Sequence, residues 1–181
     1  MNYDIFEPTF ISSTKELVRN WSIGLSKQLV PEFQLPTKKL DKKYSNQYDL
    51  WLKWLDYGIR IEVKVSRAVD SDKPDEPLYI KALSYNSKRP FDMNFQQIKT
   101  KCADVFIWIA VWRDKIKYWV LSSDEVKRNK YFSKGQHRGN VGEGQLHLNQ
   151  DNISDFVKYE VKSTEIKNAV MEAYKRQKKI I

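Results

Sequence analysis

The sequence predicts a mixed α/β domain in which helices pack on a central β-sheet. Three observations support this prediction: apolar residues recur with a helical period near each end, residues 57–68 alternate between apolar and polar side chains, and residues 105–112 form a continuous apolar run. This order of elements is typical of a sheet flanked by helices. Because 181 residues are enough to bury a sizeable core, we expect a single domain over residues 1–181.

A first helix is predicted over residues 12–31. Ser13 and Glu16 have the spacing of a capping box, and Pro31 ends the helical pattern. The apolar residues of one face are Leu17, Val18, Trp21, Leu25 and Leu29. A connector that contains proline and lysine follows to about Ser45.

Residues 47–55 and 57–68 predict two antiparallel strands joined by a tight turn at Asp56. Successive side chains of a strand point to opposite faces, so the apolar odd-numbered residues of the second strand face the core. Glu62 and Lys64 then stand together on the other face.

The segment after this hairpin predicts a loop and then a helix. Residues 69–92 contain three prolines and predict a loop with one short strand at residues 78–85. Residues 92–103 predict a short helix with Asp92 as its N-cap. We expect this helix to lead into a buried apolar strand at residues 104–112.

The last third of the chain predicts one more strand, a glycine-rich connection and a final helix. The strand covers residues 115–123. Four of the six glycines lie between Gly135 and Gly144, which indicates an irregular loop or a wide hairpin. The final helix begins near Ser163 and continues into the basic C-terminal residues.

The charge balance favours a polyanionic partner. The chain has 32 lysines and arginines against 23 acidic residues, a net charge of +9. Nucleic acid is the first candidate, because phosphate contacts supply most non-specific affinity. An anionic membrane surface and a charge that only aids solubility are the alternatives.

The cysteine content and the apolar runs indicate a cytoplasmic protein that does not span a membrane. Cys102 is the single cysteine, which excludes an intramolecular disulfide and a cage of several cysteines, and favours a reducing compartment. The N-terminal residues lack the pattern of a secretory signal. The longest apolar run, residues 105–112, is far shorter than the about 20 residues that cross a bilayer.

Acidic residues gather at the predicted hairpin. If the turn centres on Asp56 and Tyr57, Asp49 pairs across the ladder with a position between 62 and 64. Two neighbouring carboxylates repel each other unless a cation joins them, and oxygen ligands suit Mg²⁺. Such an ion would polarise a phosphodiester and help to deprotonate a water, while Lys64 would stabilise the developing charge. The alternative is an exposed hairpin with weak surface ion pairs.

The stretches YDLWL and GIRIEVKVSRA resemble the signature of the PD-(D/E)XK nuclease superfamily, the fold of most type II restriction endonucleases. The resemblance covers about residues 13–123. It implies a restriction-endonuclease-like mixed central sheet flanked by helices. It also implies that Asp49 and Glu62 bind the metal and that Lys64 is the catalytic lysine. Tyr48 precedes Asp49, where the signature has a proline.

The same resemblance implies two further catalytic residues. Glu16, in the first helix, corresponds to an extra acidic residue that some members place near the metal. Gln97, in the predicted helix after the lysine strand, corresponds to a polar residue close to the site. The alternative from the residues alone is that Glu16 only caps the helix and that Gln97 is a solvated helix position.

A loop over residues 133–149 is the predicted DNA-contacting segment. Its glycines permit close backbone approach, and its side chains include types that read base edges or phosphates. The residues predicted to bind DNA are Lys134, Gln136, His137, Arg138 and Asn140 in this loop, together with Lys88 and Arg89 upstream. The alternative is that both segments contact only water.

These inferences together predict a Mg²⁺-dependent, sequence-specific DNA endonuclease of the type II restriction class. We expect it to cut double-stranded DNA as a homodimer, because one chain supplies one hydrolytic site and a double-strand break needs two. The alternatives are a junction-resolving or repair nuclease of the same fold, and a nucleic-acid-binding module without catalytic activity.

Overall fold

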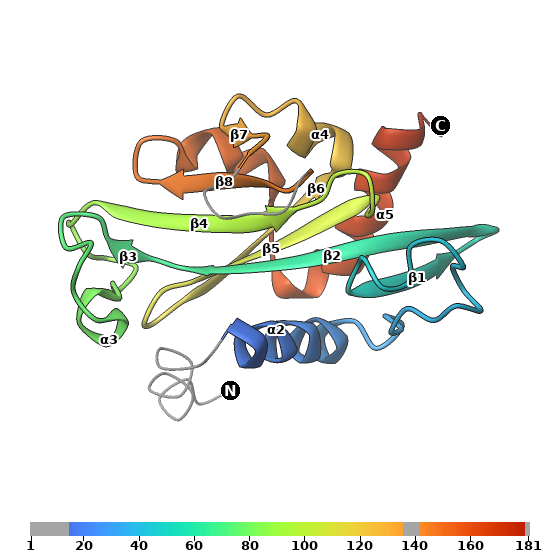
Figure 1. The fold of residues 1–181 in the computed structure, drawn as a ribbon, viewed down its shortest axis with the longest axis horizontal. Coiled ribbons are helices and arrows are strands. Elements are labelled where there is room, and N and C mark those ends of the chain that lie inside the picture. Colours follow the sequence, from blue (N-terminus) through green and yellow to red (C-terminus); the bar gives the residue numbers. More distant parts are fainter. Residues whose placement is uncertain (1–14, 136–141, 180–181) are drawn as a thin grey trace.

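The computed structural model describes residues 15–135 and 142–179, which form three layers: helices, a five-stranded sheet and a four-stranded sheet (Figure 1). The prediction of a mixed α/β fold with a mixed sheet flanked by helices is confirmed.

The five-stranded sheet has the order β1-β2-β5-β6-β9. Its strands are β1 (Leu50–Trp54), β2 (Tyr57–Arg67), β5 (Val105–Val111), β6 (Ile116–Ser122) and β9 (Glu160–Val161). Strands β2 and β5 are parallel and the other neighbours are antiparallel, which makes the sheet mixed. The predicted hairpin and the predicted strands at 104–112 and 115–123 are therefore present.

The four-stranded sheet has the order β3-β4-β8-β7. Its strands are β3 (Val69–Asp70), β4 (Phe91–Ile98), β8 (Gly144–Asn149) and β7 (Phe132–Ser133). Strand β3 follows β2 almost directly in the chain, so one long, bent segment contributes to both sheets (Figure 1). Strands β7 and β8 pair across the glycine-rich connection, as in the wide hairpin that was one of the two expectations there.

The prediction of a helix over residues 92–103 was wrong, because most of this segment is strand β4. Met93 and Phe95 alternate into the space between the two sheets, where Phe95 stacks on Trp108 with ring centroids 5.1 Å apart. Asp92, the predicted helix cap, instead binds His147 on the neighbouring strand. The connection between parallel strands β2 and β5 thus runs through a second sheet rather than through the usual crossover helix.

The prediction of a strand over residues 78–85 was also wrong. Residues Leu78–Lys81 form a short helix, α3, which begins directly after Pro77. Tyr79 and Ile80 are exposed there, so no buried face favours an extended strand.

The two long helices lie where the sequence predicted them. Helix α2 (Lys15–Leu29) and helix α5 (Ile166–Lys178) both pack on one face of the five-stranded sheet. Ser13, the predicted cap, lies outside the described residues. The remaining helical segments are α4 (Ser123–Lys127), η2 (Ile153–Tyr159) and η3 (Ser163–Glu165). Within residues 15–135 and 142–179, no helix has the length and apolar character that a membrane span requires.

The two faces of the five-stranded sheet carry two separate cores. The first core lies under α2 and α5 and includes Leu25, Ile61 and Val170. The second lies between the two sheets and includes Phe95, Phe106 and Trp108. Both faces of the central strands are therefore covered, so the polar side chains of β2 lie beside a packed core and not on an open surface.

Candidate active site

Asp49 lies directly opposite Glu62 across the β1–β2 ladder. Leu50 pairs with Ile61, so Asp49, one residue earlier, stands beside Glu62, and the Asp49 amide donates a 3.0 Å hydrogen bond to the carbonyl of Ile61. The turn centres on Leu55 and Asp56, one residue earlier than predicted, and Leu55 has a φ of 51°. The predicted proximity of Asp49 to residues 62–64 nevertheless holds.

The carboxylate of Asp49 is enclosed, with 2% of its side chain exposed. One oxygen, Oδ2, accepts a 2.9 Å hydrogen bond from the backbone amide of Val63. The other, Oδ1, accepts bonds from Nε of Arg19 at 3.0 Å and from the Nη2 of the same guanidinium. Asp49 therefore continues the ladder beyond β1 and also joins helix α2 to the sheet.

Glu62 and Lys64 form an ion pair in which Nζ of Lys64 lies 2.6 Å from Oε1 of Glu62. Their side chains are only 12% and 14% exposed, respectively. They share their face with Phe106 and Trp108, the residues paired with them on β5, and this face is covered by the second sheet. The alternative of a solvated hairpin pair is therefore contradicted.

The electrostatic environment of Glu62 disfavours its ionised form. Burial raises the pKa of Glu62 to about 7, and the charge of Lys64 opposes this rise while the charge of Asp49 adds to it. The contribution of Asp49 reflects two carboxylates that lie close together and are both largely buried.

Further polar pairs surround these residues. Arg60, two residues before Glu62 on the same face, forms a bidentate pair with the buried carboxylate of Asp104. The thiol of Cys102 donates a 2.9 Å hydrogen bond to Oε1 of Gln47. Burial raises the pKa of this thiol, and the charge of Glu62 adds to the rise. The segment before β5 is thus packed against the carboxylate site.

Arg19 is the residue of this site that the sequence analysis missed. It contacts Asp49 across 30 positions of the chain, a distance that no local pattern reveals. Its one sequence signal is its position three residues after Glu16, on the same face of the helix. The backbone of Glu16 belongs to α2, but its side chain lies outside the described part of the chain.

Gln97 lies in strand β4 and not in a helix. It is exposed and has a φ of 56° at the irregularity between Phe95 and Ile98. Phe95, two residues earlier, stacks on Trp108, the partner of Lys64 on β5. Strand β4 therefore crosses the face of the site. The catalytic role of Gln97 remains a prediction.

The predicted DNA-binding residues are only partly within the described chain. Lys88, Arg89 and Lys134 are exposed, and Arg89 forms an ion pair of 3.1 Å with the buried carboxylate of Asp70. The other four lie outside the described residues: Gln136, His137, Arg138 and Asn140. The loop predicted over residues 133–149 is shorter, because β8 begins at Gly144.

Asp49 and Glu62 are the two carboxylates of this site that could bind a cation. Among the residues that the structure describes, no three histidine, cysteine or acidic side chains are grouped as a metal cage. Mg²⁺ is commonly held by one or two carboxylates, with waters and substrate phosphates as its other ligands. Asp49 and Glu62 fit that donor set, because they are adjacent, oxygen-bearing and mutually repulsive.

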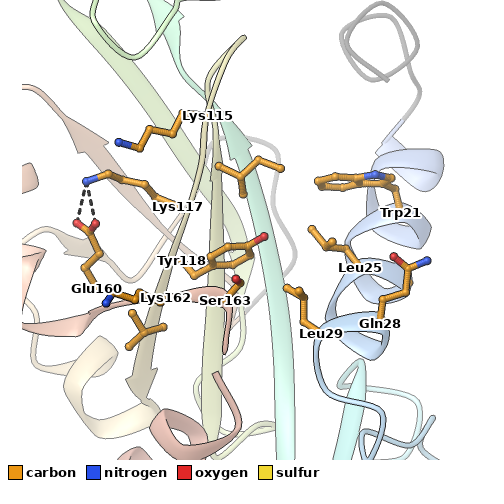
Figure 2. A pocket seen from close by; sticks show the side chains of 13 residues that line it. Trp21, Leu25, Gln28, Leu29, Lys115, Lys117, Tyr118, Glu160, Lys162 and Ser163 are labelled. Carbon is orange, nitrogen blue, oxygen red and sulfur yellow. Dashed lines mark hydrogen bonds and ion pairs between the residues drawn. The ribbon is translucent and has the colours of Figure 1, made fainter. Parts of the chain in front are cut away.

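A groove of about 650 Å³ lies elsewhere, between α2 and strands β6 and β9 (Figure 2). Trp21, Leu25 and Tyr118 provide its apolar lining, and Lys117 at its rim pairs with Glu160. Leu25 and Tyr118 belong to the first core, on the opposite face of the sheet from Glu62. None of Asp49, Glu62 and Lys64 lines this groove. The candidate active site is therefore the cluster of these three residues, and the groove is a separate feature.

Comparisons of this chain with family models, with curated proteins and with solved structures returned no significant match.

Proposed function

We propose that this protein is a Mg²⁺-dependent endonuclease that hydrolyses phosphodiester bonds in double-stranded DNA, with the sequence specificity of a type II restriction enzyme. One observation carries the proposal: Asp49, directly before β1, lies opposite Glu62 of β2, and Lys64 is paired with Glu62. Two carboxylates and a lysine around one point are the groups that such a hydrolysis requires.

Each residue of the site has a defined role in this proposal. Asp49 and Glu62 hold the ion, which when bound supplies positive charge to the phosphate and to the attacking water. The ammonium of Lys64 is held in place by Glu62 at 2.6 Å, so it is positioned to stabilise negative charge that develops on a phosphate. The nearby guanidinium of Arg60 adds positive charge, although it is already paired with Asp104.

The order of the elements supports a restriction-endonuclease-like fold as part of the proposal. Helix α2 is followed by the antiparallel pair β1–β2 and by the parallel strand β5. Asp49 lies directly before β1, and Glu62 and Lys64 lie in β2. The crossover from β2 to β5 departs from the expected pattern, because strand β4 occupies the place of the expected helix.

Double-stranded DNA is the proposed partner on the basis of charge. The chain has a net charge of +9, and Lys88, Arg89 and Lys134 are exposed. We also propose a homodimer, since two sites are needed to cut both strands. Sedimentation on a cleavable duplex tests this part, and one chain per duplex during double-strand cleavage would contradict it.

Incubation of the protein with plasmid DNA in Mg²⁺ or in EDTA tests the activity. We expect cleavage by the wild type in Mg²⁺ alone, and no cleavage by Glu62→Gln, which keeps the size of the side chain but removes its charge. The control is Glu160→Gln, which alters another Glu-x-Lys triplet, at a distance from the site, and is expected to cleave normally.

The products distinguish the candidate functions. Discrete fragments support a restriction enzyme, and a preference for branched DNA supports a junction resolvase. A gel shift without cutting by the wild type would overturn the enzyme assignment in favour of a binding module. Full activity of Glu62→Gln would overturn the active site.

A further inference from the structure

The two carboxylates of the site are paired with basic residues of very different solvent exposure. Lys64, which holds Glu62, is only 14% exposed and lies within a covered strand. Arg19, which holds Asp49, is 62% exposed and belongs to a helix at the edge of the site. Only Arg19 has solvent around it into which it can turn.

Access to Asp49 depends on this exposed arginine. The Oδ2 atom of Asp49 is bonded to the backbone amide of Val63, which is part of the sheet and cannot leave. The Oδ1 atom is bonded to Nε and Nη2 of Arg19. Because only 2% of the Asp49 side chain is exposed, a cation from solvent reaches Oδ1 only after Arg19 has moved.

The displacement of Arg19 by a cation does not leave Asp49 without a counter-charge. Water solvates the exposed guanidinium after its release, and the cation replaces its positive charge beside the buried carboxylate. A divalent cation between Asp49 and Glu62 also offsets the repulsion between these carboxylates, which lie opposite each other across the ladder.

We infer that Arg19 is a positioning residue that competes with the catalytic cation for Oδ1 of Asp49, and that the released guanidinium then binds a phosphate of the DNA. The inference rests on the proposed function. A planar guanidinium suits a phosphate as well as a carboxylate, since both accept two parallel hydrogen bonds. Arg19 therefore keeps Asp49 neutralised in the metal-free protein and supports DNA in the loaded one.

Mn²⁺ binding to the full-length protein without DNA, counted as free Mn²⁺ by electron paramagnetic resonance, tests the competition. We expect Arg19→Ala to bind Mn²⁺ about threefold to fivefold more tightly than wild type, because no guanidinium then competes with the cation for Oδ1 of Asp49. Arg19→Lys, which keeps the charge but loses the two-pronged contact, is expected to lie between them.

Arg176→Ala is the matched control. Arg176 is also a helical arginine, 48% exposed, and it pairs with the largely buried Glu125 away from the site. We expect it to leave Mn²⁺ affinity unchanged. Circular dichroism spectra establish that each variant is folded, and Arg19→Gln replaces Arg19→Ala if the latter does not fold.

The salt dependence of duplex binding in Ca²⁺ tests the second step. Loss of one phosphate contact in Arg19→Ala is expected to reduce the slope of log affinity against log salt by about one. The same substitution thus strengthens metal binding and weakens DNA binding, a combination that loss of a merely structural contact would not produce.

The outcomes separate this inference from the proposed function. If wild type binds Mn²⁺ and Arg19→Ala binds it equally or more weakly, the competition is wrong and the nuclease site stands. If the salt slope is unchanged, the phosphate contact is wrong. If neither wild type nor any variant binds Mn²⁺, both the inference and the proposed metal site are overturned.

Discussion

The Nζ atom of Lys64 lies 2.6 Å from Oε1 of Glu62, two residues earlier on the same strand, and both side chains are almost fully enclosed. A buried ion pair contributes little net stability, yet the removal of one partner leaves the other uncompensated. This relationship couples the chemistry of the site to the stability of the fold, so substitutions here affect both.

Removal of the lysine is expected to abolish cleavage and to destabilise the protein. Lys64→Ala leaves the carboxylate of Glu62 without its cation, but protonation of Glu62 limits the cost to about 1–3 kcal/mol. Urea unfolding in EDTA measures this loss. Lys167→Ala, which breaks an exposed pair with Glu32, is the control and is expected to cost less than about 1 kcal/mol. Equal losses in the two variants would show that the Lys64 pair behaves as a surface contact.

The stability of the metal-free protein is expected to depend on pH through Glu62. The pKa of Glu62 in the folded state is about 7, above its ordinary value of 4.5, so ionisation of this group opposes folding. As pH rises from 4.5 to 7, the free energy of unfolding of wild type falls relative to that of Glu62→Gln. Above pH 7 the difference between the two free energies is constant.

The size of this effect follows from the pKa difference. A shift of this size corresponds to a change of up to about 3 kcal/mol in the stability of Glu62→Gln relative to wild type across that pH range. Urea unfolding in EDTA at several pH values measures it. A difference between the two proteins that does not vary with pH would contradict the raised pKa.

Two glycine substitutions are expected to have opposite effects on stability. A Cβ atom at Gly144 would lie 2.5 Å from the carbonyl oxygen of Ser133, a backbone atom that cannot turn away. We expect Gly144→Ala to destabilise the protein by about 1–3 kcal/mol. Gly24, exposed in α2, has no atom within 4 Å of such a Cβ, so Gly24→Ala should stabilise it by about 0.5–1 kcal/mol.

Thermal unfolding of both variants measures this contrast. If Gly144→Ala unfolds at the wild-type temperature, strands β7 and β8 are not packed as closely as described.

Lys88 and Arg89 are expected to affect DNA binding in the same way but stability differently. Both are exposed, and replacement of either by alanine is expected to reduce the slope of log affinity for DNA against log salt by about one. Only Arg89→Ala is expected to destabilise the fold, because it leaves the buried carboxylate of Asp70 without its ion pair. Salt-dependent binding and urea unfolding measure the two effects, and equal stabilities for the two variants would contradict the role of Asp70.

The sequence by itself determined the elements whose burial repeats with a simple period. The helical period predicted α2 and α5, the alternation in β2 predicted its two faces, and the apolar run predicted β5. It also placed Asp49 opposite a position between 62 and 64, because a hairpin with a short turn leaves few possible registers. These predictions succeeded because each depends on residues that are close together in the chain.

Tertiary structure alone decided the identity of β4 and the surroundings of the site. Residues 92–103 carry a helix-capping signal, but Phe95 gains a stacking partner in Trp108 only when the segment is extended across the five-stranded sheet. The second sheet then covers Glu62 and Lys64, and α2 brings Arg19 to Asp49 from 30 residues away. Burial and long-range charge pairing depend on which elements meet in space, and local sequence periods contain no information about that.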